Sequence, residues 1–181
     1  MKLSPLSIII RKLHKKKMYR VIREGNYTGF PGFYGFLMRH CDTLPLSSNF
    51  KTMEKFLAAV DTVLQKGHFL LVYPEQGMWW NYRKPRPLQK GAFTFAARND
   101  KPVLPVFITM EDSDILDEDG FYVQEYTVHF CEPIYPDPEK KRAANAREMM
   151  EKNYQAWKKV YEETYKVPLT YTCPDELAKN R

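Results

Sequence analysis

The sequence predicts an α/β fold in which a mostly parallel sheet is flanked by helices. Three apolar segments of strand length, 18–24, 69–73 and 103–109, alternate with segments of helical periodicity. A continuous apolar run such as FLLVY at 69–73 is typical of a strand buried in a parallel sheet, and strands that alternate with helices favour this architecture. With 181 residues, of which 44% are apolar, we expect one domain over 1–168 and a tail over 169–181.

The N-terminal third contains a helix, a strand and a glycine-rich connection. Pro5 at an early helical position predicts a short helix that ends near Lys17, before the strand MYRVIRE. Four glycines between 25 and 35 indicate a loop and tight turn before a short helix around 33–40. A short strand is expected at 44–46.

The middle and C-terminal parts give clearer patterns. Ser48 or Asn49 can cap a helix whose apolar residues recur at helical spacing and stop before Gly67. Further elements are expected as a helix in 88–99, a strand in 121–130 and an amphipathic helix in 139–166, while the acidic run 111–119 is interpreted as a loop rather than a metal site.

Charge and cysteine usage limit the environment of the chain. Net charge is +6, and the segment 11–23 holds seven cations and no acid, which suits an anionic membrane surface, a phosphorylated ligand or simply a solvated helix face. Cys41, Cys131 and Cys173 form no C-x-x-C pair, so we expect no disulfide and a reducing cytosol. No apolar run approaches the ~20 residues of a membrane span and no signal peptide is recognisable, so we expect a cytoplasmic protein with peripheral membrane contact.

The strand at 69–73 ends in a segment that carries the candidate chemistry. Glu75 and Gly77 follow Pro74, and ligands in open α/β sheets bind outside the carboxyl ends of strands. An anionic ligand there needs cations, and a guanidinium binds phosphate through two hydrogen bonds. The nearby cations are Arg83, Lys84, Arg86 and Lys90.

The stretch YPEQGMWWNYRKPRPLQKGAFTFAARNDKPVLPV resembles the third and fourth blocks of the glycerophospholipid acyltransferases, usually (F/Y)-P-E-G-T-R, then K-G-A and V-P-V. The resemblance extends from about Lys15 to Pro138, and NYTGFPGFYGFLMRHCDTLPLSS is similar to the second block, with Gly35 as its glycine. It implies transfer of a fatty acyl group from acyl-CoA or acyl carrier protein to a lysophospholipid such as 1-acyl-glycerol-3-phosphate, without metal or redox cofactor. It also implies that Glu75 organises the acceptor-phosphate site and that Gly77 lets the backbone approach the ligand.

The chain departs from the family pattern at three places. Gln76 stands between Glu75 and Gly77, and Met78-Trp79-Trp80 replaces Thr-Arg, so the usual phosphate-binding arginine is absent there and Arg83, Lys84 or Arg86 could supply the charge. The second block's arginine is also absent near Ser47 and Ser48, where the nearest arginine is Arg39. None of the four histidines has an aspartate five residues later, and the family's His-x-x-x-x-Asp base would lie upstream of Met1.

Three interpretations follow from these departures. In the first, the chain is a shortened acyltransferase that is inactive as given. In the second, it is a non-catalytic lipid- or phosphate-binding module of the same fold; an unrelated basic α/β binding protein is a third possibility.

Aromatic side chains in the same segment suggest a lipid partner. Trp79, Trp80 and Tyr82 would contact a membrane interface or an acyl chain, or alternatively pack against the sheet. We expect no nucleic acid partner. His40-Cys41-Asp42 is interpreted as structural, because adjacent residues point in different directions.

Overall fold

The computed structural model describes residues 15–77 and 79–171. The chain divides into an N-terminal unit, residues 1–73, and a C-terminal unit, residues 74–181, which are described separately. Most of the helix predicted before Lys17 lies outside the described residues. The expectation of one domain over 1–168 stays a prediction.

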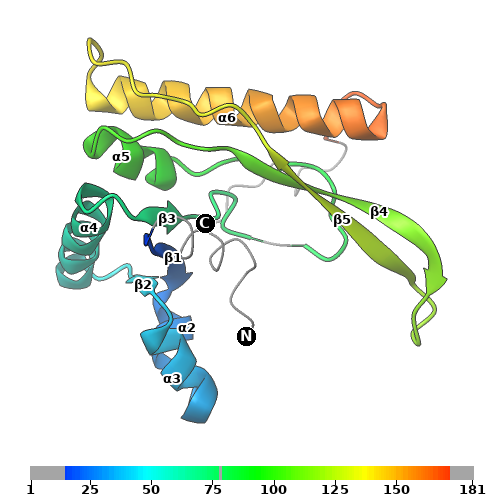
Figure 1. Cartoon of the computed structure of the whole chain (residues 1–181), viewed down its shortest axis with the longest axis horizontal. Coiled ribbons are helices and arrows are strands. Elements are labelled where there is room, and N and C mark those ends of the chain that lie inside the picture. The colour runs from blue at the N-terminus through cyan, green and yellow to red at the C-terminus, as the bar shows by residue number, and fades with distance from the viewer. Residues whose placement is uncertain (1–14, 78, 172–181) are drawn as a thin grey trace. The chain divides into compact units, whose positions relative to one another are not determined.

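The N-terminal unit contains a three-stranded parallel sheet, which confirms the predicted α/β class (Figure 1). Its strands are β1 (Met18–Arg23), β2 (Thr43–Leu46) and β3 (Phe69–Leu71), in the order β2-β1-β3. The FLLVY segment forms a shorter strand than predicted, because β3 pairs only with β1 and lies at the edge of the sheet. Phe69 is 42% exposed, so this strand is not buried on both faces.

Three helices accompany this sheet. The region predicted as a glycine-rich loop instead contains α2 (Glu24–Thr28) and the start of α3 (Gly32–His40). The long helix α4 (Phe50–Gln65) begins as predicted at Asn49, whose side chain accepts the backbone N–H groups of Lys51 and Thr52. The buried residues of α4 lie on its apolar face, and this helix packs on β2 and β3. They are Phe56, Val60, Val63 and Leu64.

The core of the C-terminal unit lies between α5 (Gly91–Arg98) and α6 (Arg142–Tyr165), which lie side by side in Figure 1. Phe93 and Met149 are both 1% exposed and meet across this helix pair. Small side chains let the two helices approach closely, and they are Ala96, Ala97 and Ala146. Both helices were predicted from the sequence.

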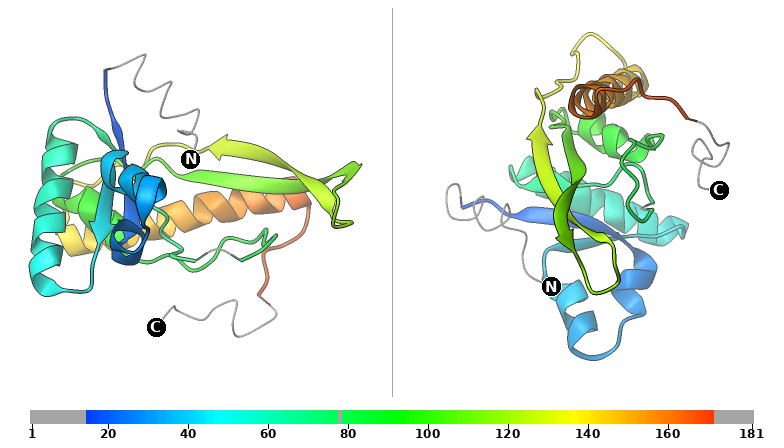
Figure 2. Two further views of the ribbon diagram at one scale, coloured as in Figure 1. Left: turned by 90° about the horizontal axis from the view of Figure 1, so that it is seen from below. Right: turned by 90° about the vertical axis from the view of Figure 1, so that its right-hand side faces the viewer.

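An antiparallel hairpin of β4 (Val106–Leu116) and β5 (Tyr122–Phe130) completes the C-terminal unit and extends past the end of α6 (Figure 2). The VLPVFIT segment therefore pairs antiparallel with β5 and does not join the parallel sheet as expected. The acidic run 111–119 is also not simply a loop, because β4 continues through it to Leu116. Acids are tolerated in this strand because its outer half is exposed to solvent.

Within residues 15–77 and 79–171, no helix is both long enough and apolar enough to cross a bilayer.

Candidate functional site

The predicted site residues lie mainly in the connection that leads into α5. We call residues 74–77 and 79–90 the site loop. Its two ends are joined because Gln89 N donates a hydrogen bond of 2.8 Å to the carbonyl oxygen of Pro74. The loop thus begins and ends at one place in the C-terminal unit.

The side chain of Glu75 makes a second contact between the two ends of this loop. Its Oε1 accepts the backbone N–H of Arg86 at 2.6 Å. Burial raises the pKa of Glu75 above its usual range, although the hydrogen bond from Arg86 N and the charge of the Arg86 guanidinium oppose that rise. That Glu75 holds a cation in place without itself touching phosphate stays a prediction, and this contact is the structural basis for it.

Arg86 is the cation that Glu75 organises. Its side chain is only 5% exposed, and its guanidinium carbon lies 4.2 Å from the centre of the Trp79 ring. The Nε atom is buried and has no hydrogen-bond partner among the described residues. A buried donor without a partner costs about 1–3 kcal/mol, so this arrangement favours an acceptor that is brought by a ligand.

The three aromatic residues of the loop behave differently from one another. Trp79 is 37% exposed and contacts both Arg86 and the edge of Tyr82, at 4.9 Å between ring centres. Trp80 is 87% exposed. Only Trp80 presents most of its surface outward, whereas Trp79 also supports the guanidinium.

The other candidate cations differ from Arg86 in burial and in their surroundings. Arg83 donates to Asp112 of β4 at 2.7 Å and to Gln124 of β5 at 3.3 Å, so it is held by the hairpin. Lys84 is half-buried and Lys90 is exposed at the start of α5. The contact of Glu75 with Arg86 is made through the backbone N–H of Arg86.

The glycine of the acyltransferase motif has an unexpected replacement. Gln76 has φ 54°, in the left-handed region, at the position directly after the glutamate where the family has glycine. Left-handed backbone costs a residue with a side chain roughly 1–2 kcal/mol. The expected role of Gly77, to let the backbone approach the ligand, stays a prediction, and the left-handed conformation occurs one residue earlier.

Gly35 lies in α3 of the N-terminal unit, and its surroundings give a packing reason for glycine. A Cβ atom there would collide with the carbonyl oxygen of Phe30 and lie 3.0 Å from Nη1 of Arg39. That Gly35 shares a cleft with Glu75 stays a prediction.

Two tyrosines near the loop were not found by sequence reasoning. The hydroxyl of Tyr171 lies 2.5 Å from the carbonyl oxygen of Pro85 and 2.8 Å from the hydroxyl of Tyr154. Burial, and then the bond to Tyr154, raise the pKa of Tyr171. No local signal could reveal these contacts, because Tyr171 and Pro85 are 86 positions apart.

Two of the histidines that the structure describes, His40 and His129, have structural partners. His129 Nε2 lies 2.8 Å from Thr109 Oγ1 across the hairpin, as expected for a structural residue. His40 Nδ1 lies 2.8 Å from the carbonyl oxygen of Phe36, while Asp42 pairs with Lys17 at 3.1 Å. Among residues 15–77 and 79–171, no group of three or more His, Cys, Asp and Glu side chains could hold a metal ion.

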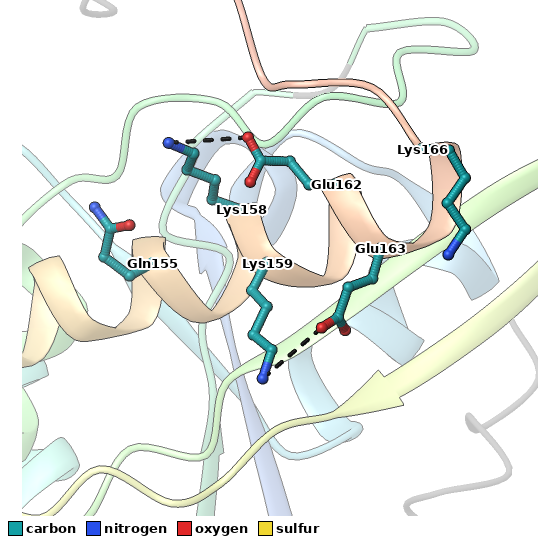
Figure 3. A pocket seen from close by; sticks show the side chains of 6 residues that line it. All are labelled: Gln155, Lys158, Lys159, Glu162, Glu163 and Lys166. Carbon is teal, nitrogen blue, oxygen red and sulfur yellow. Dashed lines mark ion pairs between the residues drawn. The ribbon is translucent and has the colours of Figure 1, made fainter.

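Two hollows of the C-terminal unit contain none of the predicted site residues. One is a charged depression along α6 whose walls carry the pairs Lys158–Glu162 and Lys159–Glu163, at 3.9 and 3.8 Å (Figure 3). The other is a groove of about 780 Å³ between the end of β5 and α6. The first is a solvated helix face whose pairs contribute little to stability.

The fold and the loop define an α/β domain with a buried arginine organised by a glutamate at the end of a strand. Residues 4–109, more than half of the chain, match the model of the Acyltransferase family, so the chain belongs to this family. No curated protein matches the chain.

A solved structure shows the same fold. The chain is similar to the crystal structure of the 1-acyl-sn-glycerophosphate acyltransferase PlsC from Thermotoga maritima, with a TM-score of 0.55 and 18% identity. The match covers 84% of this chain and 58% of that protein, so the chain spans less than two thirds of PlsC.

Proposed function

We propose that this chain provides the acceptor-binding part of a glycerophospholipid O-acyltransferase. The donor would be acyl-CoA or acyl carrier protein, and the acceptor a lysophospholipid such as 1-acyl-glycerol-3-phosphate. Membership of the Acyltransferase family supports the reaction class, and the similar PlsC is described as acting with this acceptor. The observation that carries the proposal is the buried Arg86, held by Glu75 within the family's third block.

The proposed reaction is a simple acyl transfer. The free hydroxyl of the acceptor attacks the thioester carbonyl, a C–O bond forms, the C–S bond breaks, and the donor thiol leaves with the proton of the hydroxyl. The thioester is already an activated acyl group, so the proposal includes no metal or redox cofactor. A general base is needed, and none of the histidines in the 181 residues has the family's His-x-x-x-x-Asp spacing.

Arg86 would replace the arginine that the usual motif carries two residues after its glycine. Phosphate oxygens are the acceptors that a buried guanidinium with an unpaired Nε lacks. The Trp79 ring holds the guanidinium plane, and Glu75 holds the backbone of Arg86. The ligand would then meet a cation whose position is fixed before binding.

Binding can be tested without turnover. The chain is titrated with a short-chain 1-acyl-glycerol-3-phosphate and with the monoacylglycerol of the same acyl length, which lacks the phosphate. We expect the phosphorylated lipid to bind at least ~10-fold more tightly, as a charge-assisted hydrogen bond provides. Arg86→Gln should abolish that preference, whereas Arg147→Gln, at an exposed position of α6, should keep it. Equal affinity for the two lipids would refute the proposal.

A second candidate is a non-catalytic lipid- or phosphate-binding module of the same fold, because none of the four histidines in the 181 residues has an aspartate five residues later. On either proposal the 181 residues alone should not turn over acyl-CoA with a lysophospholipid, because loss of a general base typically costs about 10²–10⁴-fold. Turnover at a rate typical of enzymes would contradict this. Coding sequence for His-x-x-x-x-Asp just upstream of Met1 would favour the enzyme, and its absence would favour the module.

An anionic membrane surface on the cytoplasmic side is proposed as the place of action. Lysophospholipid acceptors reside in membranes, and the seven cations of 11–23 together with the exposed Trp80 provide the charge and the aromatic side chain for peripheral contact.

A further inference from the structure

We propose that Tyr171 is a positioning residue for Arg86, acting through the peptide group that joins Pro85 to Arg86. The inference rests on the proposed function for its consequence in ligand binding, but its structural part can be tested alone. Tyr171 and its partner Tyr154 lie outside residues 4–109, which the family model matches. The family's own motif therefore does not include this contact.

The segment that carries Tyr171 is itself attached to α6. Lys166 takes a left-handed conformation, with φ 56°, and turns the chain at the end of the helix. Leu169 N then donates a hydrogen bond of 2.9 Å to Oε1 of Glu162. The side chain of Leu169 packs against the cluster that contains Trp157. Residues 166–171 thus return along the helix to a fixed position.

The hydroxyl of Tyr171 has one proton, and the carbonyl oxygen of Pro85 can only accept it. Tyr154 must then donate to the oxygen of Tyr171, because Tyr171 already uses its proton. The chain of donors runs from α6 through Tyr154 and Tyr171 to Pro85.

The same peptide group is bound at both of its polar atoms. Its oxygen, on Pro85, accepts Tyr171 at 2.5 Å, and its N–H, on Arg86, donates to Glu75 at 2.6 Å. A peptide group is planar and its oxygen and hydrogen point in opposite directions, so the two bonds together fix its rotation. That rotation sets the direction in which the Arg86 side chain leaves the backbone.

Mutual polarisation adds to this geometric effect. A carbonyl that accepts a hydrogen bond makes the N–H of its own peptide group a better donor. Loss of the Tyr171 hydroxyl should therefore weaken the bond between Arg86 N and Glu75, as well as removing its own bond. The Glu75 contact alone would leave the loop able to rotate about its two ends.

The structural part is tested by tryptic cleavage of the loop in Tyr171→Phe. In the loop, Lys84 and Arg86 are each followed by proline and resist trypsin, so cleavage after Arg83 reports on its interior. The variant loses the one hydrogen bond that the Tyr171 hydroxyl makes to the loop, which should raise the rate of this cut ~10-fold. An unchanged rate overturns the proposal.

Tyr165→Phe is the matched control. The Tyr165 hydroxyl also joins α6 to backbone, but it binds the N–H and carbonyl of Met110 in β4, each at 2.9 Å. This variant loses two hydrogen bonds in the same unit but keeps the aromatic ring, whose centre lies 5.9 Å from the guanidinium carbon of Arg83, so cleavage after Arg83 should stay unchanged. If Tyr165→Phe raises the rate as much as Tyr171→Phe, general destabilisation explains the effect and the proposal is wrong.

The ligand-binding consequence is measured separately, with short-chain 1-acyl-glycerol-3-phosphate as the probe. Tyr171→Phe should raise its dissociation constant ~10-fold, while the monoacylglycerol affinity and the Tyr165→Phe variant stay near wild type. Faster cleavage with unchanged lipid affinity would refute a positioning role. A wild-type chain that binds neither lipid would refute the proposed function instead, and the cleavage rates would still decide whether Tyr171 holds the loop.

Discussion

Glu75 can be changed in two ways that separate its hydrogen bond from its charge. Glu75→Ala removes the acceptor of the Arg86 backbone N–H, which is 2.6 Å away, together with the carboxylate. Glu75→Gln keeps an acceptor oxygen at the same position and removes only the charge. The two variants should therefore unfold differently, although both remove the same ionisable group.

The expected magnitudes follow from the burial of the loop. A buried N–H left without a partner costs about 1–3 kcal/mol, offset in part because the costly buried carboxylate is gone. For a chain of this length, 1 kcal/mol corresponds to about 2–4 °C in Tm. At pH 7 we expect Glu75→Ala to melt a few degrees below wild type and Glu75→Gln to melt at or above it.

The pH dependence gives an independent check with a definite sign. Burial raises the pKa of Glu75 in the folded state above the ordinary value of 4.5, so the folded chain holds the proton more tightly than the unfolded chain. The stability that comes from this proton is fully present below pH 4.5 and is lost as the pH rises through the folded-state pKa. Glutamine has no such proton, so the Tm of Glu75→Gln relative to wild type should increase between pH 4 and 7.

Melting curves recorded by circular dichroism between pH 4 and 7 measure these differences in Tm. A Tm difference between Glu75→Gln and wild type that stays constant from pH 4 to 7 would show that the carboxyl is not buried as described. Equal melting of the Ala and Gln variants at pH 7 would show that the bond to Arg86 contributes nothing. In a full-length enzyme, Glu75→Ala should lower kcat/KM far more than it lowers stability.

Three further predictions concern other parts of the chain. Gly35→Ala should cost about 1–3 kcal/mol in unfolding free energy, because its Cβ atom meets the Phe30 carbonyl. Gly25→Ala has open space around it and should be neutral or stabilising by up to ~1 kcal/mol. Denaturant unfolding that ranks the two variants in the reverse order would contradict this. Asn49→Ala should cost about 1 kcal/mol by uncapping α4, and an unchanged denaturation midpoint would count against the cap. Co-sedimentation with anionic vesicles should fall as salt rises and fall further in Trp80→Ala, and binding that ignores salt would exclude the electrostatic contribution.

Elements governed by local patterns could be predicted from the sequence. Helix α4 combines an apolar face with a capping Asn49, and both signals act within a few residues of one another. The hairpin was harder to predict from the sequence, because Glu111 and Asp112 lie in a strand whose outer half is exposed on both faces. Apolar alternation disappears where neither face is buried, so acidic residues there resemble a loop.

In the candidate site, too, some features could be predicted from local sequence and others could not. Glu75 could be placed at the end of a strand from the order of residues alone, and its importance was predicted. Its partner could not be chosen among Arg83, Lys84 and Arg86, because the choice depends on Asp112 of the hairpin holding Arg83. The contact of Tyr171 with Pro85 could not be predicted either, because these residues are 86 positions apart and only the folded chain brings them together.

The β4–β5 hairpin has a consequence for the synthesis of the chain on the ribosome. A lone two-stranded ribbon is marginal in water, and the inward residue Phe107 is covered by Trp157, which belongs to α6 and is made later. Until α6 is made, the Phe107 side chain of the nascent hairpin lacks this cover, and the ribbon presents both of its edges, as any two-stranded sheet does. Glu111 and Glu125 lie directly opposite each other on its two strands, a pairing that weakens the ribbon but repels a second ribbon. We therefore expect the acids of this segment to limit pairing between ribbons in the interval between translation of the hairpin and translation of α6.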